Sequence, residues 1–153
     1  MGSRLDLPGI APRTYAMMAR LSQASHEFGL EPLLVELMKV RASQINGCAF
    51  CVDMHTKDAR AAGEAEERLH VLVAWREAEW YSERERAALE LTEVMTRLPE
   101  GGVPDDVYAR ATELFSDEEV VGLIWVVTVI NAWNRVAITT RMEPGHYQPG
   151  GHE

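Results

Sequence analysis

The sequence predicts an all-α protein, a single-domain helical bundle over residues 1–153. Apolar residues recur at intervals of three and four through most of the chain, and no stretch shows the alternation of a strand. Two Ser-x-x-Glu capping boxes mark the starts of helices. A length of 153 residues with 46% apolar content suits one domain with a real core and excludes disorder. We expect this core to run from about residue 15 to 140, between flexible tails.

The N-terminal half contains four predicted helices. They cover about residues 15–29, 32–46, 48–63 and 65–75. Gly29 suits the end of the first helix, and Pro32 suits the first turn of the second. Asn46-Gly47 is typical of a helix C-terminus, so the second and third helices should form a core helical hairpin.

The C-terminal half contains three more predicted helices. Ser82 with Glu85 opens one that runs to residue 98, and a shorter helix covers 104–115. Ser116 with Glu119 opens the most apolar helix. Its apolar run is about half the length of a membrane span, which favours a buried helix over a membrane anchor. A helix that is apolar all round must be covered on all sides, but in a chain of 153 residues the other helices could cover most of it, so composition alone does not require a homo-oligomer.

Charge and targeting signals narrow the possible partners and compartments. A net charge of −9 argues against nucleic-acid binding, because an acidic chain is repelled by phosphate backbones. No secretory signal is visible, so the cytoplasm is the expected location. The two cysteines are three residues apart, too close to staple a fold, which in this compartment indicates redox chemistry or metal binding.

The segment that carries chemistry is Cys48 to His55. Cys48, Cys51 and His55 lie at positions i, i+3 and i+7, so a helix places them along one stripe. Residues three apart on a helix are close enough for a disulfide. The helix N-terminus favours a thiolate at Cys48, whereas His55 is placed to take the proton of Cys51. These two arguments nominate different nucleophiles, and the residues alone do not decide between them.

Other interpretations of the same residues were weighed. The cysteines could be two small buried hydrophobic residues. They could also bind zinc, in which case His26, His70 or Glu36 would have to complete the ligand set. Glu36 lies in an apolar stretch, so we expect it to be partly buried, with a raised pKa that suits a general base.

Glu36 followed by Cys48, Cys51 and His55 resembles the alkyl hydroperoxidase D-like (AhpD-like) branch of the carboxymuconolactone decarboxylase superfamily. The resemblance extends over about residues 15–140, including the segment 131–135. It implies an all-α protein that assembles as a trimer or hexamer and works as an alkyl hydroperoxide reductase without metal or flavin. It also implies that Cys51 reacts with a peroxide, that Cys48 resolves the sulfenic acid, and that His55 and Glu36 relay protons. An external dithiol, a lipoylated protein in the best-studied member, then reduces the disulfide.

One position departs from that pattern, because Phe50 stands where the best-studied member has a second His. Two alternative functions were considered: a carboxymuconolactone decarboxylase-like lyase and a non-enzymatic redox-sensing oligomer. The lyases lack the cysteine pair, so Cys48 and Cys51 argue against the first. Asn131 and Arg135 lie four apart on the last helix, and we expect them to cap or pair rather than to join the site.

Overall fold

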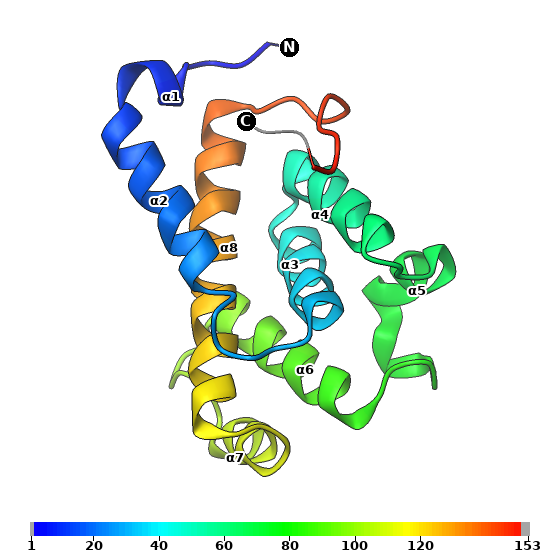
Figure 1. Cartoon of the computed structure of the whole chain (residues 1–153). Helices are drawn as coiled ribbons and strands as arrows, with labels where there is room; N and C mark the ends of the chain where they lie inside the picture. Colours follow the sequence, from blue (N-terminus) through cyan, green and yellow to red (C-terminus); the bar gives the residue numbers. More distant parts are fainter. Residues whose placement is uncertain (1, 151–153) are drawn as a thin grey trace.

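The computed structural model describes residues 2–150, and within this range the chain forms helices and no strand (Figure 1). The helices are α1 (Leu7–Ile10), α2 (Pro12–Ala24), α3 (Pro32–Asn46), α4 (Ala49–Ala61), α5 (Glu66–Val71), the 3₁₀ helix η1 (Leu72–Glu77), α6 (Glu83–Arg97), α7 (Asp105–Leu114) and α8 (Asp117–Thr140). The predicted all-α fold is confirmed.

Helix boundaries follow local signals that the sequence displays. Ser82 and Ser116 are the N-caps of α6 and α8, and both capping boxes are complete. Between α3 and α4, Gly47 has a φ of 72°, in the left-handed region that favours glycine. This tight turn lets α4 fold back against α3, so the predicted hairpin is present.

The long helix α8 runs between α2 and α3 and contacts α2, α3, α4 and α6 (Figure 1). By length and composition it could cross a membrane, although the core helix of a soluble protein passes the same test. Its buried side chains include Leu123, Val126 and Ile130, so α8 contributes much of the core. Near its C-terminal end, Ala137 packs against Cys48 and Cys51.

Three stretches differ from the predicted helices. The first predicted helix was expected to reach Gly29, but α2 ends at Ala24 and a turn follows it. The short helix α1 precedes α2 and contains no buried residue, so no apolar periodicity indicated it. The fourth predicted helix divides into α5 and η1, with non-helical backbone angles at Ala74. This change of direction accompanies the burial of Leu72 and Trp75 in a core cluster with Leu37. Tertiary packing therefore overrides the helix propensity of the segment.

Candidate active site

Cys48 and Cys51 lie at the N-terminus of α4. Cys48 is the N-cap, and its Sγ accepts a hydrogen bond from the backbone N–H of Cys51 at 3.3 Å. The two residues form a disulfide, with Cα atoms 5.3 Å apart. Both are almost fully buried. The structure thus holds this pair in its oxidised form.

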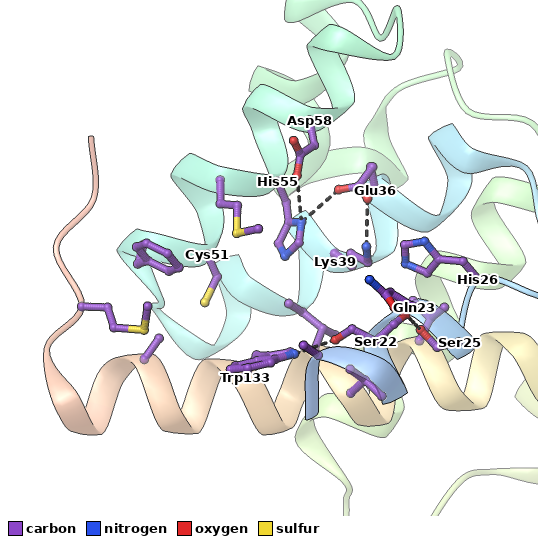
Figure 2. Close-up of a pocket in the computed structure, with 18 of the residues that line it drawn as sticks. Ser22, Gln23, Ser25, His26, Glu36, Lys39, Cys51, His55, Asp58 and Trp133 are labelled. Carbon is purple, nitrogen blue, oxygen red and sulfur yellow. Dashed lines mark hydrogen bonds and ion pairs between the residues drawn. The ribbon is translucent and has the colours of Figure 1, made fainter. Parts of the chain in front are cut away.

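A cavity of about 390 Å³ opens beside the disulfide, and Cys51 lines it whereas Cys48 does not. Its walls come from α2, α3, α4 and α8 (Figure 2). Most of the lining is apolar or aromatic: Tyr15, Ala19, Phe50, Met54, Val126, Val129, Ile130, Trp133, Ala137 and Met142. The position that departs from the resembled pattern, Phe50, is part of this apolar wall. Cys51 therefore faces the cavity, and Cys48 does not.

His55 and Glu36 meet at the polar side of the same cavity. His55 Nδ1 lies 3.0 Å from Glu36 Oε2, and Lys39 Nζ donates to Glu36 Oε1 at 2.9 Å (Figure 2). All three side chains are about one-eighth exposed or less. The structure thus brings Glu36 of α3 together with Cys51 and His55 of α4, as three of the four predicted site residues around one cavity.

The pKa of Glu36 corrects an expectation from the sequence. Burial raises this pKa, but the hydrogen bond from His55 and the charge of Lys39 outweigh it and lower the pKa to about 2. The apolar neighbours in sequence indicated the burial and gave no sign of these two partners. Glu36 is therefore a carboxylate at neutral pH, which can hold a proton donor in place but is a weak base.

This charge also assigns the protons of His55. An ionised carboxylate can only accept a hydrogen bond, so Nδ1 of His55 is the donor to Glu36. In a neutral imidazole, Nε2 is then left with its lone pair. Figure 2 shows the ring of His55 extending from Glu36 toward the cavity, on the same side of α4 as the sulfur of Cys51. His55 can thus accept a proton at Nε2 while Glu36 stabilises the resulting imidazolium.

Several cavity residues were not identified from the sequence. Trp133 Nε1 donates to Ser22 Oγ at 2.7 Å, and the Trp133 ring packs edge-on against Tyr15 at 5.2 Å between centroids. These contacts join α8 to α2 and close the apolar side of the cavity. The sequence did not identify this contact, because the convergence of Tyr15 and Trp133 depends on tertiary packing.

The histidines proposed as further zinc ligands lie apart. His26 lines the cavity, where burial and the charge of Lys39 lower its pKa, so its ring is neutral at pH 7. His70 is on α5, largely exposed and outside this cavity. Glu36, His55 and Asp58 have possible metal-ligand atoms that lie within 4.8 Å of one another. Lys39 already pairs its positive charge with Glu36, where a metal ion would otherwise bind.

The polar residues of the last helix have a structural role. Asn131 donates to Thr96, and Arg135 donates to the carbonyl and side-chain oxygens of Asn131. Neither lines the cavity, as expected. Fully buried Asn134 instead connects α8 to α3, because it donates to Ser43 and accepts from Asn46.

Comparisons with known proteins agree with this fold. The model of the carboxymuconolactone decarboxylase (CMD) family matches residues 12–94. YdfG of Bacillus subtilis (strain 168), an uncharacterized protein, is 43% identical over 138 residues, which cover 90% of this chain and 94% of YdfG. ATU0492 from Agrobacterium tumefaciens is a protein of unknown function with a suggested role as the antioxidant defence protein AhpD. Its crystal structure matches this fold with a TM-score of 0.90. The two chains are 37% identical, and the match covers 95% of this chain and 100% of the ATU0492 chain.

The debrominase Bmp8 has the same fold, with a TM-score of 0.80 and 15% sequence identity. The match covers 90% of this chain and 74% of the Bmp8 chain. The helical hairpin with its Cys-x-x-Cys pair and the similarity to ATU0492 define an AhpD-like protein. The chain belongs to the carboxymuconolactone decarboxylase family. The resemblance found in the sequence is thereby confirmed, and it points to a peroxidase-related or other CMD-family function.

Proposed function

We propose that this protein is a thiol-dependent peroxidase that reduces organic hydroperoxides through a Cys48–Cys51 dithiol and disulfide cycle. The observation that carries the proposal is the position of Cys51, which faces an apolar cavity beside His55 while its disulfide partner lies outside that cavity. An apolar cavity suits the organic part of a hydroperoxide. His55 supplies a proton acceptor on the helix that carries the thiol.

The proposed cycle has two chemical steps within the chain. His55 takes the proton of Cys51, and the thiolate attacks the terminal oxygen of ROOH. The O–O bond breaks, the alkoxide receives the proton and leaves as ROH, and Cys51 becomes a sulfenic acid. Cys48 then attacks the sulfur of Cys51, the S–OH bond breaks, and hydroxide leaves as water with the thiol proton. The sulfurs are joined in the disulfide, and the peroxide has been reduced by two electrons.

An external dithiol must return two electrons and two protons to complete the cycle. A lipoylated protein, the donor implied by the family resemblance, is our candidate for this partner. The cytoplasmic location and the homo-oligomeric state remain predictions alongside it.

A thiol titration tests the proposal. The reduced protein should present two thiols per chain, and one equivalent of cumene hydroperoxide should consume both. The product should have the monomer mass less two hydrogens, because the disulfide is intramolecular. Retention of both thiols after peroxide treatment, or formation of intermolecular dimers alone, would refute the cycle.

Turnover distinguishes an enzyme from the redox-sensing alternative. With excess dithiol, an enzyme should consume many equivalents of hydroperoxide per chain at a rate far above that of the dithiol alone, whereas a sensor should add little to that background rate. The Cys51→Ser variant, shown to be folded by its thermal melt, serves as the control because it lacks the attacking sulfur.

A further inference from the structure

The C-terminal segment that follows α8 returns along α4. The backbone N–H of Gly145 donates to Asp53 Oδ2 at 2.9 Å, and Lys57 Nζ donates to the carbonyl oxygen of Tyr147 at 3.1 Å. Figure 1 shows this segment, in red, beside the start of α4. Two successive turns of the helix that carries Cys51 therefore hold the C-terminal segment in place.

A third contact leads from this segment to the site. The hydroxyl of Tyr147 donates to Asp58 Oδ1 at 2.6 Å. The other oxygen of the same carboxylate, Oδ2, lies 3.9 Å from Nδ1 of His55, at ion-pair distance (Figure 2). Asp58 also lines the cavity. Tyr147 is thus connected to His55 through one side chain.

Two carboxylates therefore approach the same nitrogen of His55, since Glu36 Oε2 lies 3.0 Å from Nδ1. Negative charge at Nδ1 favours the tautomer with its proton there, which leaves Nε2 free to accept a proton. It also stabilises the imidazolium once that proton has arrived. Lys39 binds Glu36 through its other oxygen and offsets part of the charge of that carboxylate, which increases the importance of a second acid.

We propose that Asp58 is a positioning residue for His55, and that Tyr147 of the C-terminal segment holds Asp58 in that orientation. This inference rests on the proposed function, because it explains how His55 is kept ready to take the proton of Cys51. The Asp58 side chain is about one-quarter exposed, at 24%. Without the hydroxyl of Tyr147, its carboxylate could turn toward water and away from His55.

The test uses the full-length chain in a Cys48→Ser background, so that Cys51 is the one thiol present. Asp58→Asn removes the charge, Asp58→Glu keeps it, and Tyr147→Phe removes the hydroxyl alone. Matched controls are Asp106→Asn and Tyr108→Phe, both exposed on α7. Thermal melts of all variants should establish that each is folded.

Two readouts are independent of peroxidase turnover. The first is the ¹⁵N NMR spectrum of the His55 ring, assigned by its loss in His55→Gln, which reports the tautomer. The second is the rate at which iodoacetamide alkylates Cys51, which follows the thiolate fraction. For Asp58→Asn we expect this rate at pH 7 to fall about tenfold, because a smaller fraction of Cys51 is then thiolate.

The expected pattern is a shift of the His55 tautomer toward Nε2–H in Asp58→Asn, a smaller shift in Tyr147→Phe, and none in the α7 controls. Asp58→Glu should keep more of the alkylation rate than Asp58→Asn. An unchanged tautomer and rate in Asp58→Asn would overturn the inference even if the enzyme reduces peroxide. The expected pattern in a protein without peroxidase activity would support the positioning role and refute the proposed function alone.

Discussion

Cys51 faces the cavity that His55 also lines, whereas Cys48, to which it is bonded, lies outside that cavity. The sequence supported both cysteines as nucleophile, and the structure shows that the two arguments concern different properties. The N-terminus of α4 favours a thiolate at Cys48, which accepts the N–H of Cys51. Access to a substrate favours Cys51. A stabilised but enclosed thiolate suits a resolving cysteine, which only has to reach its neighbour.

The division of roles predicts which sulfur is oxidised first. In Cys48→Ser, peroxide should leave a sulfenic acid on Cys51, because no thiol remains to resolve it. In Cys51→Ser, peroxide should form no sulfenic acid on Cys48, because Cys48 does not face the cavity. Dimedone labelling followed by peptide mass spectrometry measures both. Labelling of Cys48 with an unreactive Cys51 would reverse the roles.

The apolar cavity predicts selection by the organic group of the hydroperoxide. Ala19 of α2 lines the cavity, so Ala19→Phe should narrow it and raise the KM for cumene hydroperoxide by about tenfold or more, the effect of losing one or two methylene-sized contacts. The small H₂O₂ molecule should react at an unchanged rate. Ala16→Phe, exposed on the same helix, is the control. Equal effects of Ala19→Phe on both peroxides would show that the cavity does not select.

The lowered pKa of Glu93 predicts how the free energy of unfolding depends on pH. Its carboxylate is buried on α6 and accepts hydrogen bonds from Trp75, Arg41 and Arg76. Burial raises the pKa of Glu93, but these three donors outweigh it and lower the pKa from 4.5 to about 2. Because the folded pKa is lower than the unfolded one, this stabilisation is complete above about pH 4.5 and is lost as the pH falls toward 2.

Glu93→Gln should therefore lower the free energy of unfolding by about 3 kcal/mol at pH 7, and the difference from wild type should shrink as the pH falls from 4.5 to 2. Urea unfolding at a series of pH values measures this difference. Glu113→Gln, exposed on α7, should show no such dependence. A difference that stayed constant with pH would mean that the charge of Glu93 does not stabilise the fold.

The surface of α8 predicts self-association. Val121 and Trp125, four residues apart and therefore on one face of α8, are each about two-fifths exposed, so the bundle does not cover this face. We propose that a second copy of the chain covers this face in a trimer or hexamer, with more than about 2,000 Å² buried. Light scattering should give a multiple of 17.2 kDa, and Trp125→Glu should reduce it to 17.2 kDa. Trp80→Glu, at an exposed tryptophan outside α8, is the control, and a wild-type monomer with full activity would contradict the prediction.

Much of the fold could be predicted because its signals are local. Capping boxes at Ser82 and Ser116, and a glycine at position 47, act within one helical turn and determine where helices begin and end. The helix period then places Cys51 and His55 on one side of α4, whereas Cys48 lies just before this helix as its N-cap. The division of the segment 66–77 into α5 and η1 could not be predicted, because it depends on how Trp75 is buried against distant helices.

By itself, the sequence determined the all-α class, the hairpin and the candidate site residues, because helix period, caps and motif spacing are properties of neighbouring residues. Only the tertiary structure decided which cysteine faces the cavity, that Lys39 and His55 keep Glu36 ionised, and that Tyr147 contacts Asp58. Each of these results depends on how side chains from different helices or turns meet. Burial and charge at such meeting points are set by packing, which the order of residues along the chain does not display.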